Sequence, residues 1–380
     1  MAMTSSLFTG SRYLGKRPGG KQKRPLSTRS DTFVRGWRTG GCASSERIVG
    51  RTGFLFVFVI GCSTAPAADP AVPRRPIAPV AAAFRPFSAT SPWNTPVPPN
   101  PKLAPDSDAL IADLAASSQW PFLTVNIEQY GIPVYFADRR TPRQKVKVTR
   151  VGGLGFERRD VEVPIPPETT PAVGTDKHVC IVDKQTNQEW DFWEAAKTPG
   201  GWTCSVCAMA DLAGNGVRPP AAAGAWWMGH GARACGFPLM AGLISVDEMR
   251  RGRIDHALVI AYPHIRSRYY TPPASTAQAT TDQAVSTRGI PCGGRIQLDP
   301  ALDLGALGLS PSGRIIARAL QQYGAFVGDF SGAVSLYADA SPSAQVAWKA
   351  GLLDTYEVKN QIDLHRFRVL ELGLLYDNHN

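Results

Sequence analysis

Short runs of alternating apolar and polar residues recur along the chain from about residue 122 onward. Such alternation places one set of side chains on a buried face and is typical of half-buried β-strands. The runs are rich in β-branched and aromatic residues, and 36 glycines and 32 prolines in 380 residues punctuate the chain densely, as turns between short strands require. Strands are therefore predicted over residues 122–127, 132–136, 145–151, 161–165, 178–183, 188–193, 256–262, 294–298, 324–329 and 333–337.

Helical patterns are fewer. Residues 106–114 place Leu110, Ile111 and Leu114 on one face, behind a polar N-cap. Residues 310–324 form the clearest helix, with Ser310 as the cap and Gly324 at the end. Short helices are expected near 246–250 and 344–349. With strands in excess and no alternation of strand and helix, the pattern predicts a mainly β protein: an antiparallel β-sandwich, jelly-roll-like, with a few short helices on loops.

An apolar run from Phe54 to Ile60 follows Arg51 and precedes Gly61 and Cys62. It is too short to span a bilayer, which takes roughly 20 apolar residues, and it fits the core of an export signal. The four residues 59–62 resemble the lipobox of bacterial lipoproteins. This resemblance implies lipidation of Cys62 and a lipoprotein of the outer or cell-surface membrane, anchored through its lipid. The alternative is an ordinary secretory signal cut near residues 65–68.

Charge divides the chain at the same place. Eleven of the 41 Lys and Arg residues and two of the 31 Asp and Glu residues precede Cys62, which leaves 30 basic and 29 acidic residues. The remainder lacks the basic field that phosphate backbones require, so nucleic acid is not expected as a partner. We expect a signal region at 1–61, with 1–48 as upstream sequence before a start nearer Val49. A Pro- and Ala-rich tether at 62–86 and one β-sandwich domain at 87–380 follow.

Five cysteines follow Cys62, and an exported chain meets an oxidising compartment in which disulfides form. The odd number allows two bridges and one free thiol, or fewer bridges. Cys204 and Cys207 have the spacing of a redox pair or of half a zinc site. Neither a thioredoxin-like unit nor a second close pair accompanies them, so structural cysteines are favoured, with connectivity left open.

Several runs together carry a likeness to known sequences. They include residues 91–94 (SPWN), 236–244 (GFPLMAGLI), 255–258 (DHAL), 290–300 (IPCGGRIQLDP) and 319–329 (ALQQYGAFVGD). In their order they resemble a widespread family of secreted bacterial proteins, over roughly residue 87 to the end. The resemblance implies export and a single domain of similar length. It carries no activity over to this chain.

Paired carboxylates on one strand suggest acid–base chemistry on sugars. Alternation places Glu189 and Asp191 on one face, and a bulge could bring Glu194 round to it. Two such groups suit a retaining glycosidase, in which one attacks the sugar and the other protonates the leaving oxygen. The spacing is similar to the Glu-x-Asp-x-x-Glu motif of laminarinase-like jelly-roll glycosidases. The structural alternative is an edge strand with solvated acids.

A second set of candidate residues suits a polysaccharide lyase. The set is similar to that of jelly-roll polysaccharide lyases, which use His or Tyr as the base. The likeness implies His256 or Tyr323 as the base, and Arg295 with Gln297 to neutralise the carboxylate of a uronic acid. Asp329 closes a strand as a further candidate acid or as a turn residue. The structural alternatives are a hydrogen-bonded core histidine and an arginine paired with a nearby acid.

Three residues form a candidate sugar-stacking platform or a plug over the core: Trp226, Trp227 and His230. The polar loop from Asp211 to Gly216 offers few oxygen ligands, so no cofactor is expected and calcium is the weaker alternative to a plain loop. Together these features favour a surface-tethered, polysaccharide-active enzyme, with hydrolase ahead of lyase. A non-catalytic module that binds glycan or cell-wall polymer is the alternative from another class.

Overall fold

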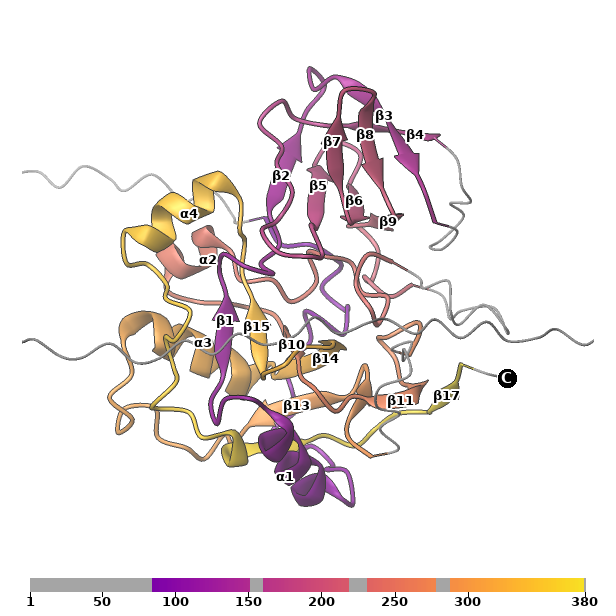
Figure 1. Cartoon of the computed structure of the whole chain (residues 1–380). Coiled ribbons are helices and arrows are strands. Elements are labelled where there is room, and N and C mark those ends of the chain that lie inside the picture. The colour runs from indigo at the N-terminus through magenta and orange to yellow at the C-terminus, as the bar shows by residue number, and fades with distance from the viewer. Residues whose placement is uncertain (1–83, 151–159, 219–230, 278–287, 379–380) are drawn as a thin grey trace, which may run out of the picture. The chain divides into compact units, whose positions relative to one another are not determined.

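The computed structural model describes residues 84–150, 160–218, 231–277 and 288–378 (Figure 1). The expectations for the export signal, Cys62, Trp226, Trp227 and His230 lie outside the described residues. All described residues fall within one of the two units into which the chain divides, Arg75–Asn380. Of the helices in these ranges, none has the length and apolar content to span a bilayer.

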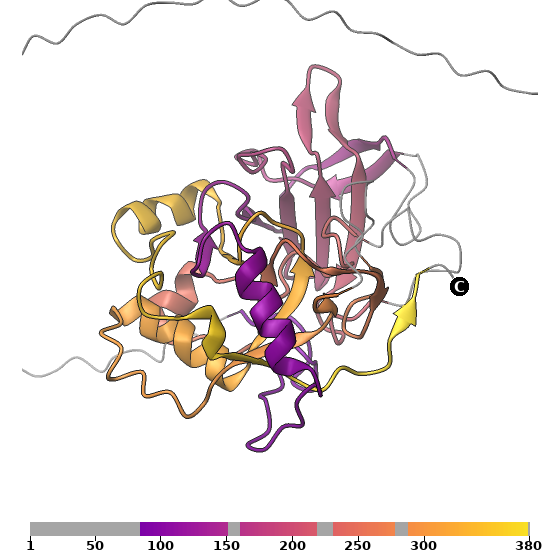
Figure 2. The ribbon, with the colours of Figure 1, turned by 60° about the horizontal axis from the view of Figure 1, so that its bottom comes forward.

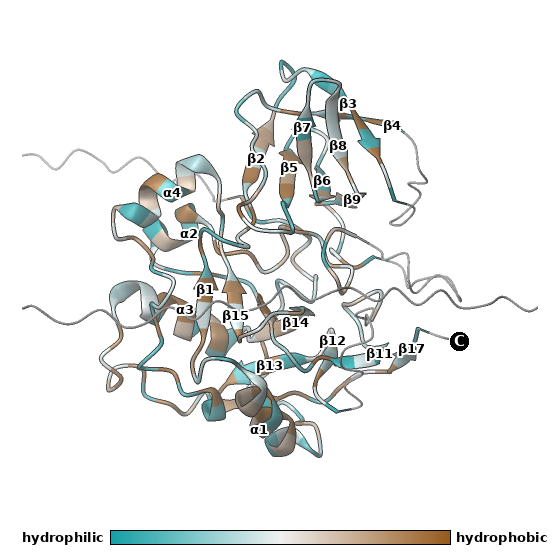
Figure 3. Ribbon diagram, viewed as in Figure 1, coloured by the Kyte–Doolittle hydropathy of each residue, from teal (hydrophilic) through white to brown (hydrophobic). Residues whose placement is uncertain are grey.

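Two four-stranded sheets enclose the first core. One sheet has the order β2 (Val134–Ala137), β5 (Val179–Asp183), β6 (Gln188–Trp193) and β9 (Val206–Asp211). The other has the order β4 (Asp160–Pro164), β3 (Arg143–Val148), β8 (Gly201–Cys204) and β7 (Ala196–Thr198). Their inward side chains share one apolar cluster, which includes Val146, Val163, Ile181, Phe192 and Trp202. This is a sandwich-like arrangement, and Figure 3 shows the apolar residues of β2 and β5 against the hydrophilic positions of β3.

A six-stranded mixed sheet carries the second, larger core. Its order is β1 (Thr124–Asn126), β15 (Ser335–Tyr337), β10 (Leu258–Ala261), β14 (Ala325–Asp329), β13 (Arg295–Leu298) and β16 (Phe367–Val369). Helix α1 (Ser107–Ser117) packs on β16 and helix α3 (Pro311–Gln322) on β13 (Figure 2). Strands β10 and β14 are almost wholly buried, because helices and loops cover the sheet.

Smaller elements complete the described fold. A three-stranded sheet has the order β12 (Pro291–Cys292), β11 (Arg266–Tyr270) and β17 (Tyr376–Asp377). The short helices are α2 (Val246–Arg251), α4 (Pro342–Lys349) and the 3-10 turn Leu364–Arg366. One disulfide, between Cys235 and Cys292, ties the segment after residue 231 to β12. Cys180, Cys204 and Cys207 are free and buried.

The predicted mainly β fold with few short helices is confirmed. Eight of the thirteen strand pairings among the described residues are antiparallel and five are parallel. Helix α3 follows its predicted signals, since Ser310 accepts from the Gly313 N–H and Gly324, just past the helix end, has a φ of 66°. In α1 the three predicted apolar residues are buried, but Asp106 makes no side-chain cap.

Candidate functional site

Glu189 and Asp191 lie on the same face of β6, as the alternation predicts, and each is completely buried. Asp191 accepts a hydrogen bond from Arg218 Nη2 at 2.9 Å and another from the Leu239 N–H at 3.2 Å. Glu189 accepts from the Met240 N–H at 2.8 Å. The pair therefore ties β6 to the chain segment at residues 239–240 and compensates the buried charge of Arg218.

Burial and the neighbouring Asp191 raise the pKa of Glu189 well above its ordinary range, and a side-chain hydrogen bond joins the two groups. Glu189 is thus protonated, and Asp191 forms the ion pair with Arg218. Sγ of Cys180 lies 3.7 Å from Glu189 Oε1, and donor atoms of these three residues lie within 4.8 Å of one another. Burial also raises the pKa of the Cys180 thiol. A cation would have to displace both protons and Arg218, so the group fits a hydrogen-bonded cluster better than a metal centre.

Glu194, the third carboxylate of the motif, follows the last residue of β6 with a φ of 53°. Its carboxylate accepts a hydrogen bond from the Ser205 hydroxyl. Among the described residues, no hydrogen bond connects Glu194 with Glu189 or Asp191. The motif thus divides between a buried pair and a separate turn residue.

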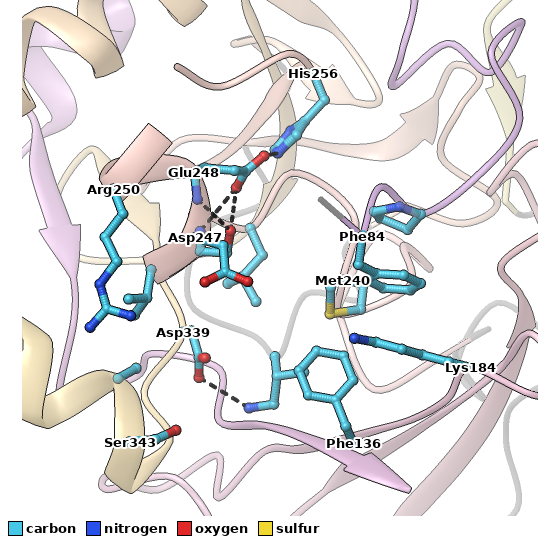
Figure 4. A pocket seen from close by; sticks show the side chains of 16 residues that line it. Phe84, Phe136, Lys184, Met240, Asp247, Glu248, Arg250, His256, Asp339 and Ser343 are labelled. Atoms are coloured by element: carbon cyan, nitrogen blue, oxygen red, sulfur yellow. Dashed lines mark hydrogen bonds and ion pairs between the residues drawn. The ribbon is translucent and has the colours of Figure 1, made fainter. Parts of the chain in front are cut away.

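His256 lies just before β10, at one end of a pocket of about 320 Å³ (Figure 4). Its Nε2 lies 2.9 Å from Glu248 Oε1 and its Nδ1 lies 2.9 Å from the Ala257 carbonyl oxygen. Because both ring nitrogens face acceptors, the imidazole is doubly protonated, and the Glu248 carboxylate raises its pKa against the opposing effect of burial. In this arrangement His256 is a charged partner of α2 and has no free lone pair with which to act as a base.

Arg295, Gln297 and Tyr323 lie close together. The side chains of Arg295 and Gln297 are both hydrogen-bonded to other residues of the protein. Arg295 donates to the carbonyl oxygens of Tyr323 and Thr95 at 2.7 and 2.8 Å, and burial lowers its pKa to about 10. The Gln297 amide donates to the Gln321 carbonyl, and its oxygen accepts from the Arg368 guanidinium. These contacts connect β13 with the end of α3 and with β16.

Asp329 belongs to a different group, at the end of β14. It is partly exposed, and its pKa is raised to about 6, first because of burial and further because of Asp176. The hydroxyl of Tyr337, on β15, makes a side-chain hydrogen bond with it. Burial and Asp329 raise the pKa of Tyr337 well above its usual range. The tyrosine therefore stays protonated, and its hydroxyl donates the hydrogen bond to Asp329.

His178 precedes β5 and is buried. Burial lowers its pKa to about 4, with Arg233 acting in the same direction. Its Nδ1 lies 3.2 Å from the Phe192 carbonyl oxygen, which can only accept, so in the neutral ring Nδ1 carries the proton and Nε2 has a lone pair. The charge of Asp176, two residues earlier, raises the pKa values of His178, of Asp329 and of Tyr337.

Arg233 lies at the centre of this group with 1% of its surface exposed. Its guanidinium carbon is 4.6 Å from the centre of the Tyr337 ring, and Nη2 donates to the Leu239 carbonyl oxygen at 3.2 Å. Within the part of the chain that the structure describes, Nε and Nη1 have no hydrogen-bond partner. A buried cation with unused donors is costly, and a further hydrogen-bond acceptor would stabilise it.

We call Asp176, His178, Arg233, Asp329 and Tyr337 the Arg233 cluster. It contains groups whose pKa values are displaced in opposite directions around an under-bonded cation, which is typical of functional sites. Of the candidates taken from the sequence, only Asp329 belongs to it. The other four lay in parts of the sequence without a recognisable motif. The one signal that could have pointed to them was the pair of Asp176 and His178, just before and at the start of a predicted strand.

The remaining candidate, the Asp211 loop, forms a turn. Asp211 Oδ1 accepts from the Ala213 N–H at 2.9 Å, and Asn215 Oδ1 accepts from the Val217 N–H at 2.9 Å. Both bonds run from a backbone N–H to a side-chain oxygen two residues earlier, which is the pattern of an Asx turn.

A comparison of the chain with protein-family models, with curated protein sequences and with solved structures found no match.

Proposed function

We propose that the protein is a polysaccharide lyase that cleaves an acidic glycan by β-elimination at the Arg233 cluster. The observation that carries the proposal is the buried guanidinium of Arg233, which has two unused nitrogens beside a neutral histidine and a protonated tyrosine. These are the residue types that such chemistry needs. The residues proposed here differ from His256, Arg295 and Tyr323, the lyase candidates that the sequence suggested.

Arg233 would bind the carboxylate of a uronic acid. A guanidinium matches a carboxylate in geometry, and in a buried site its charge is poorly screened. Neutralising the carboxylate stabilises the negative charge that develops when the hydrogen on the adjacent carbon is removed as a proton. This makes proton abstraction the step that Arg233 assists.

His178 would act as the base through Nε2. A histidine whose pKa is about 4 is neutral at pH 7 and can accept a proton there. The electron pair of the broken C–H bond forms the new C=C bond, and the glycosidic C–O bond breaks. Tyr337 would give its proton to the leaving oxygen, and the imidazolium of His178 would restore it. Asp329, hydrogen-bonded to Tyr337, would position that hydroxyl.

Hydrolysis is the second candidate, and the pKa of Asp329 favours it. A carboxylic acid with a pKa of about 6 can protonate a glycosidic oxygen near neutral pH, as a glycosidase requires. Asp176 would then be the second carboxylate, acting as nucleophile or as base. This pair replaces Glu189 and Asp191, whose carboxyl groups bind Arg218 and the backbone N–H groups of Leu239 and Met240.

A screen of polyuronides and neutral polysaccharides tests both candidates. Lyase action gives new reducing ends together with absorbance at 235 nm from the unsaturated product, on uronic polymers only. Reducing ends without that absorbance support the hydrolase. If neither signal arises on any polymer, both proposals fail, and a glycan-binding protein without catalytic activity becomes the leading account.

A polymer substrate also fits the proposed location. Export and a lipid anchor at Cys62 would place the domain where polysaccharides and cell-wall glycans lie. These remain proposals that the sequence supports, through the apolar run ahead of Gly61 and Cys62.

A further inference from the structure

We propose a second binding site, for an uncharged glycan chain, in a groove beside β1. Its volume is about 350 Å³, and it is lined by Trp120, Tyr130 and Tyr356 together with residues of β1 and β15. We call it the Trp120 groove. The proposal does not depend on the Arg233 cluster, since the two sites share no residue.

Exposed aromatic rings are the first argument. Three large aromatic side chains along the groove are well exposed: Trp120 at 44%, Tyr130 at 40% and Tyr356 at 48%. Exposed aromatic residues gathered in one place often mark a binding surface. The Trp120 ring stacks on Phe122 at 6.0 Å between centres, and Phe122 meets Tyr356 edge-on at 6.0 Å. These contacts hold the rings in place. Rigid, amphipathic rings of this kind bind ligands at a low cost in conformational entropy.

Tyr130 is held in place by its backbone. Its φ of 58° is in the left-handed region, which a bulky side chain rarely adopts. Its ring lies against Gly174, where a Cβ atom would come within 3.0 Å of Tyr130 Cε1. The Tyr130 N–H donates to the Val173 carbonyl oxygen at 3.0 Å. A strained residue that stays partly exposed suggests a function other than packing.

Charge defines the ligand class. The lining includes Glu128 as its one charged residue, with the amides of Asn126 and Gln129 beside hydroxyl groups, and the Lys359 ammonium lies 5.2 Å from the centre of the Tyr356 ring. Amides and hydroxyls can hydrogen-bond sugar hydroxyls, and one acid and one base give the groove no excess charge of either sign. The groove therefore suits neutral sugars or N-acetylated sugars, in contrast to the cationic Arg233 cluster.

A peptide strand added to β1 is a poorer occupant. Although β1 is an edge strand, the Val125 N–H already donates to the Thr355 carbonyl oxygen at 2.9 Å. The backbone edge is thus partly used, and side chains are left as the binding groups.

Affinity electrophoresis tests the proposal. The full-length protein is run through native gels containing hydroxyethyl cellulose, xylan, β-glucan or glycol chitin, and through a gel containing polygalacturonate. We expect at least one uncharged polymer to retard the wild type, and Trp120→Ala and Tyr356→Ala each to weaken that binding about tenfold. Retardation by polygalacturonate should be the same for all three proteins.

Phe136→Ala is the matched control, because Phe136 is 48% exposed but lines the pocket at His256 instead. It should bind as the wild type does. The proposal is overturned if no uncharged polymer retards the wild type. It is equally overturned if Phe136→Ala loses binding to the uncharged polymer while the groove variants keep it. Loss of polygalacturonate binding alone in the groove variants would overturn it as well. Thermal melts of all variants, expected to agree within a few degrees, show that the fold is retained.

Discussion

Two carboxyl groups with raised pKa values, Glu189 and Asp329, differ in what surrounds them. Glu189 is completely buried and shares a hydrogen bond with Asp191, so its proton is part of a closed structural pair. Asp329 is partly exposed and lies beside a hydroxyl and a guanidinium that has unused donors. Alternation along β6 correctly predicted that Glu189 and Asp191 share a face. It could not predict that Arg218, 27 residues on, would pair with Asp191.

The buried pair should respond unequally to neutral substitutions. Glu189→Gln keeps a donor toward Asp191 and should change the free energy of unfolding by less than about 1 kcal/mol. Asp191→Asn leaves Arg218 as an uncompensated buried cation and should cost about 3–5 kcal/mol. Urea unfolding measures both. Equal losses, or a larger loss for Glu189→Gln, would contradict the assignment of the proton to Glu189.

Asp329 should lower stability at neutral pH. Its pKa rises from 3.8 unfolded to about 6 folded, so between these values the folded state holds more protons and stability falls as pH rises. The full shift corresponds to about 3 kcal/mol, which partial exposure reduces to about 1–2 kcal/mol. Asp329→Asn should therefore be more stable than the wild type at pH 8 and similar to it at pH 4. Urea unfolding that finds the variant less stable at pH 8 would refute this account of Asp329.

At the scale of elements, helix α2 is held at its start by a side-chain network. Ser245 and Glu248 form a reciprocal capping box, and Glu248 also pairs with His256 ahead of β10. The helix is only six residues long, so its own hydrogen bonds cannot stabilise it alone. The sequence predicted the helix, but not the histidine that connects it to the six-stranded sheet.

This ion pair should contribute most to stability between about pH 4.5 and 6.5. The pKa of His256 is raised, so its contribution is complete below the unfolded value of 6.5 and is lost as pH rises through the folded value. The pKa of Glu248 is lowered, so its contribution is complete above 4.5 and is lost as pH falls. His256→Gln should thus be destabilised more at pH 5.5 than at pH 9, as measured by urea unfolding. His365→Gln is the control, because the ion pair of His365 with Asp363 is exposed and should contribute little to stability at either pH. A pH-independent loss for His256→Gln would disprove the charged pair.

Elements with strong local signals were predictable, and those defined by pairing were not. Helix α3 has its own cap, proline and apolar stripe, and most predicted strands overlap observed ones. Seven strands were missed: β7, β8, β9, β11, β12, β16 and β17. Of these, β7, β12, β16 and β17 are only two or three residues long, and β8, β9 and β11 contain at most one β-branched residue each. Alternation also carries no information about partners, so the parallel pairs β2 with β5 and β3 with β8 could not be predicted.

At the scale of the whole molecule, the candidate site depends on contacts across the chain. The Arg233 cluster draws residues from before β5, from the segment after residue 231 and from β14 and β15. The disulfide between Cys235 and Cys292, 57 residues apart, holds the segment that carries Arg233. No local pattern brings residues 176 and 337 together, so of the residues in the Arg233 cluster the sequence pointed only to Asp329.

The most direct test compares two tyrosine variants on the polyuronide that the wild type cleaves fastest. Tyr337→Phe removes the proposed proton donor and should lower kcat about 10²–10⁴-fold, with KM little changed and the fold intact. Tyr323→Phe, which removes a hydroxyl at the C-cap of α3, should keep near-wild-type kcat. Loss of activity in Tyr323→Phe with activity retained in Tyr337→Phe would contradict the placement of the active site at the Arg233 cluster.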